Sequence, residues 1–342
     1  MRTGMSRRSL LAGAAAVAGA LQTFGTAHAS IPDHSIAPTP AGKLKIAMFS
    51  KHLQFLDVTE AAKAAKDMGF DALDLTVRPE GHVLPENVGT DLPKAVDIIH
   101  KAGLEIPMIT TEITPDTLPM AQSILSAASK LGIRNYRWGG MKYNPSLGIQ
   151  AQLDALKPKV RALAELNKRT GTCGMYHTHS GPGMIGATIW DVYELFRDLD
   201  PQAIGVNYDI GHATVEGGYG GWINTAKLTK GMMRGIAMKD FIWARNEKGS
   251  THPDPYDKSL GVAGAWVPHW CPVDQGMVRF DAFFEIVKTN GFDGPLQLHI
   301  EYPLGGAENG KKTLTLPREK VLESMHSDLT AIKAHMAKAG LA

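Results

Sequence analysis

The sequence has few cysteines, few aromatic residues and almost no net charge. Its 342 residues include two cysteines, Cys173 and Cys271, so a disulfide framework does not organise the fold. The two could pair in an oxidising compartment, but Cys173 lies early in a strand-like run, which favours a buried free thiol. The formal net charge is +2, without the basic excess that holds a phosphate backbone, which argues against a nucleic-acid partner.

Long apolar runs are also lacking. Residues 10–21 are apolar but too short, and too rich in alanine and glycine, to span a bilayer stably. They follow a twin-arginine sequence at 6–11 and precede the small-residue site 27–29, so residues 1–29 are predicted to be a twin-arginine signal peptide. An uncleaved N-terminal anchor is the alternative. We therefore expect an exported, periplasmic protein, whose charge falls to −1 once the three arginines of this segment are removed.

The rest of the chain alternates between strand-like and helix-like segments. Residues 30–42, rich in proline and small residues, are predicted to be an exposed leader. No G-x-G-x-x-G separates the first strand-like segment from the first helix-like one, which weakens a dinucleotide-binding hypothesis. The eight predicted strands are 45–50, 72–77, 106–111, 133–138, 172–179, 204–212, 235–240 and 296–301. Predicted helices include 58–68, 91–102, 118–131, 150–170 and 317–338.

Glycines punctuate these units in the way that helix C-caps do. They stand between a helix-like and a strand-like segment at Gly69, Gly103, Gly132 and Gly291. Eight such units predict a single-domain α/β fold over residues 43–342, a (β/α)8 TIM barrel, with an open doubly wound sheet as the rival. Long loops are expected at 241–278 and 302–316, and both should lie over the C-terminal mouth of the barrel.

Polar side chains that can bind a metal end the late predicted strands. His177 and His179 share one face of their strand, His299 and Glu301 share one face of theirs, and Asp209 lies near the end of 204–212. Polar side chains repeated on one face of an apolar strand are costly inside a barrel unless they are paired or ligate something. Mixed histidine and carboxylate ligands suit a divalent ion such as Mn, Co or Zn, and a polar network without metal is the alternative.

These strand ends resemble those of the xylose isomerase-like barrel superfamily, and the resemblance covers the whole mature chain. It rests on residues 176–179, 209–212, 238–240 and 299–302, and 239–243 with 276–278 resemble an exported sugar isomerase/epimerase-like branch. The epimerase members have Glu, Asp, His and Glu ligands on strands five to eight. Asp209 and Glu301 match this pattern by type, whereas the strand-five position holds His177 and the strand-seven position holds Ala237.

The resemblance implies a set of ligands that differs from the epimerase pattern. We expect His177, Asp209, His212 and Glu301 to hold the divalent metal, with His179 as an alternative to His212 and Glu112 as a further candidate. Which of the three histidines ligate, and which lie behind the ligands, stays open at this point.

The resemblance also implies chemistry on a sugar or keto-sugar. A metal would bind a carbonyl and stabilise an enediolate, and a base would remove the neighbouring proton. Glu301 and His179 are the candidate bases, while Lys239 either holds an oxyanion, protonates a leaving oxygen or forms a salt bridge. Isomerisation is the plainest reaction. Because one of the two opposed glutamates of the epimerases is missing, an eliminating lyase or hydrolase on 3-keto-glycosides and a non-catalytic sugar-binding barrel are the alternatives.

Other side chains are predicted to shape the substrate pocket. Arg78 suits a carboxylate or a row of sugar hydroxyls, and Trp138, Trp243 and Trp270 could stack on a sugar face. The partner expected is a small sugar, with no nucleic acid and no stable membrane span after signal removal; the oligomeric state stays open, with a homo-oligomer as one option. The predicted substrate contacts are His52, Arg78, His82, Glu112, Trp138, Trp243 and His299.

Overall fold

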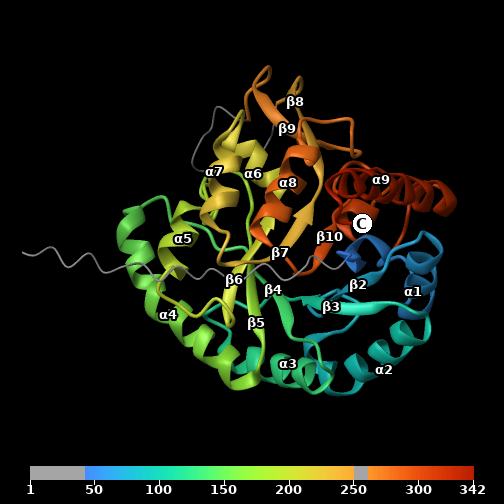
Figure 1. Ribbon diagram of the computed structural model, residues 1–342, viewed down its shortest axis with the longest axis horizontal. Coiled ribbons are helices and arrows are strands. Elements are labelled where there is room, and N and C mark those ends of the chain that lie inside the picture. The colour runs from blue at the N-terminus through green and yellow to red at the C-terminus, as the bar shows by residue number, and fades with distance from the viewer. Residues whose placement is uncertain (1–42, 250–260) are drawn as a thin grey trace, which may run out of the picture. The chain divides into compact units, whose positions relative to one another are not determined.

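Eight parallel strands close into a barrel in the computed structural model, which describes residues 43–249 and 261–342. The strand order is β1-β10-β7-β6-β5-β4-β3-β2, which confirms the predicted (β/α)8 barrel (Figure 1). The predicted signal peptide (1–29) and leader (30–42) lie outside the described residues. The barrel strands are β1 (Ile46–Phe49), β2 (Ala72–Thr76), β3 (Glu105–Thr110), β4 (Asn135–Gly139), β5 (Cys173–His177), β6 (Ile204–Asp209), β7 (Met233–Met238) and β10 (Leu296–Leu298).

The barrel strands are buried on both faces, so most read as continuous apolar runs rather than alternating ones. Every residue of β1, β2, β5, β6 and β10 is buried. The barrel closes where Ile46 of β1 pairs with Leu296 of β10 and Ala47 pairs with Ala72 of β2. This closure brings the carboxyl ends of all eight strands to one rim, where the polar residues are.

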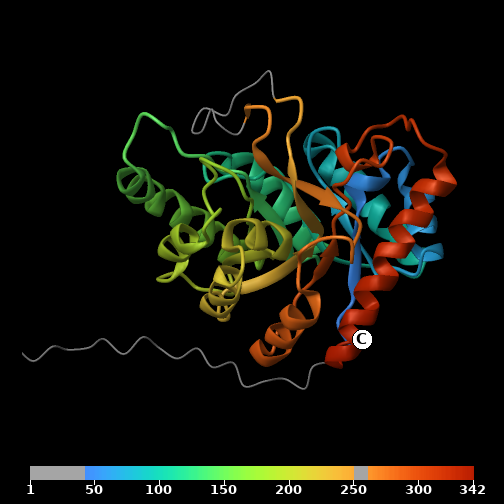
Figure 2. The ribbon, with the colours of Figure 1, turned by 90° about the horizontal axis from the view of Figure 1, so that it is seen from above.

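Helices surround the barrel, as Figures 1 and 2 show from two directions. The side chain of Asp57 caps α1 by accepting a hydrogen bond from Glu60 N at 2.9 Å. Gly171 and Gly291 end α4 and α8 in the left-handed conformation that glycine adopts without strain. The helices are α1 (Val58–Asp67), α2 (Val88–Lys101), α3 (Leu118–Lys130), α4 (Ile149–Thr170), α5 (Trp190–Phe196), α6 (Ile210–Gly217), α7 (Gly221–Leu228), α8 (Phe280–Asn290) and α9 (Arg318–Ala339), with short 3-10 turns η1 (Ser50–Leu53), η2 (Pro85–Asn87) and η4 (Ala307–Asn309).

The main core lies between the strands and this helical layer. Trp138 of β4 packs against Tyr176 of β5 with ring centroids 5.0 Å apart, and against Phe196 of α5 at 6.0 Å. A smaller buried cluster of Met108, Cys173 and Met175 lies apart from this core. Cys173 is a buried free thiol, as predicted, and burial raises its pKa to about 11.

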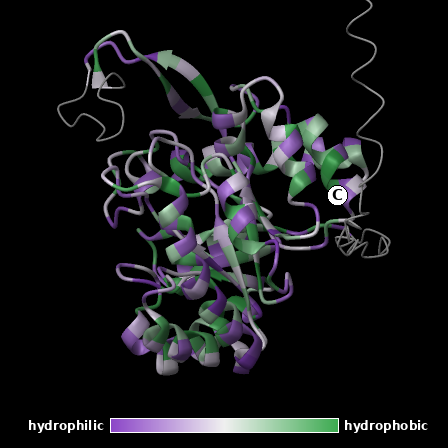
Figure 3. Ribbon diagram, turned by 90° about the vertical axis from the view of Figure 1, so that its left-hand side faces the viewer, coloured by the Kyte–Doolittle hydropathy of each residue, from purple (hydrophilic) through white to green (hydrophobic). Residues whose placement is uncertain are grey.

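The segment predicted as one long loop contains an antiparallel ribbon instead. Strands β8 (Asp240–Arg245) and β9 (Trp266–Cys271) pair from Asp240 with Cys271 to Arg245 with Trp266. The expectation of a loop was wrong because both runs are rich in aromatic and β-branched residues, which favour strands. The ribbon projects away from the barrel, as Figure 3 shows, while its inner end lies over the mouth.

The helices of the described ranges were also compared with the requirements of a bilayer. None of them is both long and apolar enough to cross a membrane.

Candidate active site at the barrel mouth

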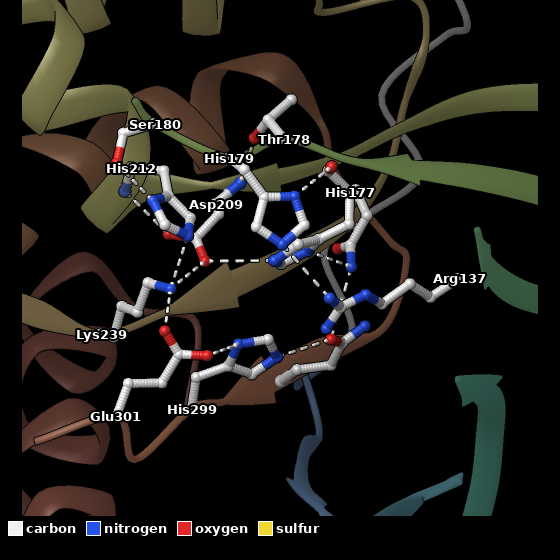
Figure 4. A network of polar contacts seen from close by, with 12 residues as sticks. Arg137, His177, Thr178, His179, Ser180, Asp209, His212, Lys239, His299 and Glu301 are labelled. Carbon is white, nitrogen blue, oxygen red and sulfur yellow. Dashed lines mark hydrogen bonds and ion pairs between the residues drawn. The ribbon is translucent and has the colours of Figure 1, made fainter. Parts of the chain in front are cut away.

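The candidate site is built from side chains at the carboxyl ends of β5, β6, β7 and β10 (Figure 4). His177 is the last residue of β5, Asp209 is the last of β6, and Lys239 directly follows β7. Asp209 also caps α6, because its Oδ1 accepts a hydrogen bond from His212 N at 2.9 Å. That cap orients the carboxylate and places His212 in the first turn of a helix, whereas the sequence predicted strand up to this residue.

Lys239 is the charge centre of the site. Its ammonium Nζ lies 2.6 Å from Glu301 Oε2, 3.3 Å from Asp209 Oδ2 and 2.7 Å from His212 Nε2. It also sits 4.1 Å from the centroid of the Trp270 ring, which β9 brings over the mouth. Only 2% of the Lys239 side chain is exposed, so its charge is balanced by these carboxylates rather than by water.

The two carboxylates of this cluster differ in how readily they take a proton. Burial raises the pKa of Asp209 to about 6, against the opposing attraction of Lys239. Burial also raises the pKa of Glu301, but Lys239 and Lys51 outweigh it and hold that pKa well below its usual range. Glu301 is therefore ionised at neutral pH, and it is the more accessible of the two, with 22% of its side chain exposed.

Four histidine rings crowd the same space. The His177 ring lies 4.5 Å from that of His179 and 5.2 Å from that of His299, and His179 lies 5.1 Å from His212, all between centroids. Burial lowers the pKa of His179 to about 3 and the pKa values of the other three well below the usual range. All four rings are consequently neutral at physiological pH, which is the form that ligates metals.

Hydrogen bonds decide which ring nitrogens remain available. Lys239 can only donate, so His212 Nε2 is an acceptor and its Nδ1 donates to Ser180 Oγ at 2.7 Å. His179 Nδ1 donates to the His177 carbonyl at 3.1 Å, and its Nε2 meets Arg137 Nη2 at 3.4 Å. Both rings are therefore fully engaged by protein atoms.

His299 is different, because one of its nitrogens has no partner. Its Nε2 donates to Gln297 Oε1 at 3.1 Å, which leaves a lone pair on the buried Nδ1. Asp209 Oδ2 is also buried, and its nearest polar neighbours are Lys239 Nζ at 3.3 Å and His177 Nε2 at 3.5 Å. The Asn207 amide lies 3.1 Å from His177 Nδ1, so His177 Nε2 is the nitrogen that faces Asp209 Oδ2, at 3.5 Å.

These residues fit a divalent metal ion. Within residues 43–249 and 261–342, potential ligand atoms approach within 4.8 Å of one another in two groups: His177 with Asp209 and His299, and His177 with His179 and His212. The first group contains the unbonded buried nitrogen of His299, and such atoms are rare in folded proteins unless something satisfies them. Two imidazoles and a carboxylate are ligands that Mn, Co and Zn accept.

The structure does not bring the four expected ligands, His177, Asp209, His212 and Glu301, together around one point. Lys239 Nζ lies among Asp209, His212 and Glu301 and occupies His212 Nε2, while Glu301 belongs to neither ligand group. His299, which the sequence suggested as a substrate contact, takes a place beside His177 and Asp209 instead.

A second group of cations borders the site around Phe49. Lys51 Nζ, Arg78 Cζ and Arg137 Cζ lie 5.9, 5.7 and 5.5 Å from the centroid of its ring. The ring of Phe49 in turn stacks on His299 at 4.7 Å. Arg78, predicted to contact substrate, thus lies in a positively charged group next to the candidate metal ligands.

Two of the side chains predicted to contact substrate make structural contacts instead. His52 is buried and bonds backbone groups with both nitrogens, at 3.2 Å to Ala307 O and 3.0 Å to Ile300 N, so it holds the loop after β10. Trp138 is 1% exposed and faces the helical layer, because its parity on β4 is opposite to that of Arg137. Trp138 therefore faces away from the mouth, whereas the His52 ring supports it by packing edge-on against Phe49, with centroids 5.3 Å apart.

The remaining predicted contacts lie around the rim. His82 is half-buried with its Nδ1 3.2 Å from Thr76 Oγ1, Glu112 is exposed after β3, and Trp243 is 37% exposed on the ribbon. The sequence interpretation missed Arg137 and Asn207. Strand parity would have found both, since Arg137 alternates with Trp138 and Asn207 stands two residues before Asp209.

Comparisons with known proteins agree with this architecture. The solved D-psicose 3-epimerase with D-tagatose from Clostridium cellulolyticum has a TM-score of 0.61 at 9% identity, covering 86% of this chain and 99% of that one. The 3-keto-D-glucoside 4-epimerase from E. coli has 0.57 at 14%, covering 84% and 100%. A xylose isomerase-like TIM barrel protein from Mycobacterium smegmatis in complex with magnesium has 0.57 at 16%, covering 84% and 98%.

The sequence itself gives the family. No curated protein matches the chain. The profile of the family described as xylose isomerase-like TIM barrel matches residues 62–324, which reach from α1 to α9 and include all the residues of the candidate site after β2. The chain therefore belongs to the xylose isomerase-like TIM barrel family.

Proposed function

We propose that this protein is a divalent-metal-dependent enzyme that modifies a sugar or keto-sugar by removing the proton next to a carbonyl. The observation that carries the proposal is the buried contact of Lys239 with Glu301 beside the group of His177, Asp209 and His299. The names of two similar structures, a D-psicose 3-epimerase and a 3-keto-D-glucoside 4-epimerase, support a carbohydrate substrate.

The metal would be held by His177 Nε2, Asp209 Oδ2 and His299 Nδ1. When bound there, a divalent cation supplies Lewis-acid polarisation of a carbonyl. Gln297 orients the His299 ring from behind, since Gln297 Oε1 accepts from His299 Nε2. Ligation by His177 Nε2 places the His177 proton on Nδ1, so the Asn207 side-chain amide, which meets Nδ1 at 3.1 Å, must present its oxygen there as the acceptor. A similar structure in complex with magnesium supports a metal at this barrel mouth.

Glu301 is the base in this proposal. It is ionised, partly exposed to the mouth, and its Oε1 lies 3.9 Å from His299 Nδ1, so a carbonyl compound bound beside His299 would present its neighbouring C–H to Glu301. Lys239 holds the carboxylate in place and its ammonium stabilises the negative oxygen that develops when the proton leaves. His212 and Trp270 fix the position of Lys239.

Elimination from a 3-keto-glycoside is the second candidate reaction. Two opposed carboxylate bases would allow protonation from either face of a carbon, but the strand-five position at which the epimerases carry the other glutamate holds His177, which this proposal assigns to the metal. A single base beside the ammonium of Lys239 suits removal of a proton followed by protonation of a leaving oxygen. The name of the E. coli structure, a 3-keto-D-glucoside epimerase, supports this substrate class.

Hydrogen exchange in D2O tests the proposal. The metal-loaded protein is incubated with ketohexoses and with a 3-keto-glucoside, and NMR follows deuterium entering next to the carbonyl and the release of the aglycone. Deuterium incorporation alone indicates isomerisation, and aglycone release indicates elimination. We expect Glu301→Gln to lower the rate by roughly 10²–10⁴-fold, because it removes the base. The exposed Glu285→Gln on α8 is the matched control and should keep the full rate.

One outcome would reverse the proposal. If the metal-loaded protein binds a sugar yet exchanges no substrate proton, the barrel is a sugar-binding protein rather than an enzyme.

A further inference from the structure

Three cations at the mouth are not used by the proposed reaction. Lys51, Arg78 and Arg137 come from three segments of the chain and meet around Phe49, each with its charged group within 6 Å of the ring centroid. Arg137 is inward-facing on β4, Lys51 lies in η1 and Arg78 follows β2. Like charges brought together repel, so this arrangement is unfavourable without a compensating anion.

The protein places little negative charge close to these three cations. In the described part of the chain no carboxylate oxygen lies within 4.0 Å of the guanidinium of Arg78 or Arg137, and Lys51 reaches Glu301 Oε1 only at 3.7 Å. Glu301 is already paired with Lys239. Burial, with Arg78 as the nearest repelling charge, lowers the pKa of Arg137 to about 10, which reflects the same shortage of negative charge.

Asp74, a further acidic group that acts on these arginines, is poorly suited to neutralise them. Asp74 on β2 is fully buried, and both of its oxygens accept from the Thr110 hydroxyl, at 2.9 and 2.7 Å. Burial raises its pKa to about 7, so it carries only part of a negative charge at neutral pH. The cation group therefore retains a surplus of positive charge.

This surplus adjoins the proposed reaction centre. Phe49 stacks on His299, Arg137 Nη2 meets His179 Nε2 at 3.4 Å, and Lys51 reaches Glu301. A ligand whose carbonyl lies beside His299 and Glu301 would extend one end over Phe49, towards the two guanidinium groups.

We propose that Lys51, Arg78 and Arg137 form a subsite for a carboxylate on the substrate, so that the enzyme acts on an acidic keto-sugar rather than a neutral one. The inference deepens the proposed function and rests on it. Guanidinium groups bind carboxylates through paired, charge-assisted hydrogen bonds, and the ring of Phe49 holds them in place. A carboxylate would offset part of this surplus and fit the planar guanidinium groups, and the titration below distinguishes it from a phosphate.

Calorimetric titration of the metal-loaded full chain with three matched keto-sugars tests the inference. The probes are D-fructose, D-fructuronate and D-fructose 6-phosphate, which differ in the group at C6. We expect D-fructuronate to bind at least about tenfold more tightly than D-fructose, as charge-assisted hydrogen bonds contribute. Arg78→Gln and Arg137→Gln should each weaken D-fructuronate about tenfold and leave D-fructose unchanged.

Arg245→Gln is the control, because Arg245 also packs on an aromatic ring, 5.6 Å from the centroid of Trp266, but on the exposed ribbon. It should leave all three affinities unchanged. Should Arg137→Gln fail to fold, the half-exposed Arg78→Gln still decides the matter. Equal affinity for D-fructose and D-fructuronate, no detectable binding of D-fructuronate, or no effect of Arg78→Gln overturns the subsite. If D-fructose 6-phosphate binds more tightly than D-fructuronate, and does so through the same residues, the carboxylate assignment is overturned and the subsite binds a phosphate.

The readout also separates the two proposals. Titration of the metal-loaded Glu301→Gln variant, which lacks the proposed base, gives the affinity without turnover, so a preference for D-fructuronate stands even if no substrate proton exchanges. Conversely, proton exchange on neutral ketohexoses with no preference for the acid supports the proposed function and removes the subsite.

Discussion

At the scale of single residues, Lys239 decides the electrostatics of the mouth. Its ammonium stands within 3.3 Å of two carboxylates and one imidazole in a space closed to water. The same contact keeps Glu301 ionised and prevents His212 from offering Nε2 to a metal. One side chain thereby separates the proposed base from the proposed metal ligands.

Replacing Lys239 should therefore cost stability as well as activity. We expect Lys239→Met to lower the free energy of unfolding by about 3–5 kcal/mol, because it leaves the buried Asp209 carboxylate without its cation and leaves Glu301 with only the more distant Lys51. Urea denaturation followed by circular dichroism measures the change. Lys227→Met, on an exposed position of α7, is the control and should stay within about 0.5 kcal/mol of the wild type. Equal stability of both variants would contradict the ion-pair argument.

At the scale of elements, the β8–β9 ribbon is anchored where it leaves the barrel. Asp240 accepts hydrogen bonds from the backbone N–H groups of Phe241, Gly276 and Val278, at 2.8, 3.0 and 3.0 Å. Residues 239–243 and 276–278, which carried part of the family resemblance, are thus the two halves of one anchor. Because β9 carries Trp270 over Lys239, the anchor also shapes the site.

Gly276 allows this close approach. A Cβ atom added there would stand 2.1 Å from Asp240 Oδ1, so Gly276→Ala must displace the anchor. We expect it to lower the free energy of unfolding by about 1–3 kcal/mol in chemical denaturation. Gly231→Ala, which would enter open space, should change it by less than about 0.5 kcal/mol. If the two alanine variants were equally stable, Asp240 would not anchor the ribbon.

A buried carboxylate on the C-terminal helix α9 is expected to make the stability of the fold depend on pH. Asp328 of α9 accepts hydrogen bonds from Tyr302 Oη at 3.0 Å and Val273 N at 3.1 Å, and burial raises its pKa from 3.8 to about 7. Between about pH 4 and 7 the folded chain binds this proton and the unfolded chain does not, so the contribution of Asp328 to stability falls as pH rises. That contribution is fully present below the unfolded pKa and is lost above the folded one.

Asp328→Asn isolates this effect because it removes the titrating group and keeps the shape. We expect the free energy of unfolding of the wild type, relative to the Asn variant, to decline from pH 4 to pH 7 and to level off above. Urea denaturation at a series of pH values gives the difference. Parallel curves for the two proteins would show that Asp328 does not titrate in this range.

At the scale of the whole molecule, the barrel brings the proposed metal ligands together. His177, Asp209 and His299 follow three different strands and meet only when the sheet closes. A divalent ion that binds only this closed state stabilises it. Mass spectrometry of purified protein should find about one divalent ion per chain, with a raised thermal midpoint after loading.

Two variants locate that ion. Asp209→Ala should lose it, whereas Glu301→Gln should keep it, since Glu301 pairs with Lys239 and lies outside the ligand group. Loss of the ion in both variants would instead place the metal on the set first expected from the sequence, which includes Glu301 as well as Asp209.

The sequence was sufficient for the barrel because each strand and helix carries its own local signal. The apolar runs and the glycines that follow the helices predict the repeated units wherever they occur, and Gly69, Gly103 and Gly132 all adopt the expected positive φ. Strand parity likewise placed His177, Asp209 and Glu301 near the mouth, because side chains alternate along a strand whatever surrounds it.

Tertiary structure alone decided which of these groups are engaged. Lys239 Nζ reaches His212 and Glu301 from another strand, backbone groups take both nitrogens of His52, and Arg137 joins Lys51 and Arg78 around Phe49. Such contacts depend on the register of strands far apart in the chain, and no local pattern encodes it. The residue types and their strand ends were therefore set by the sequence, whereas their partners, charges and free lone pairs arose only when the barrel closed.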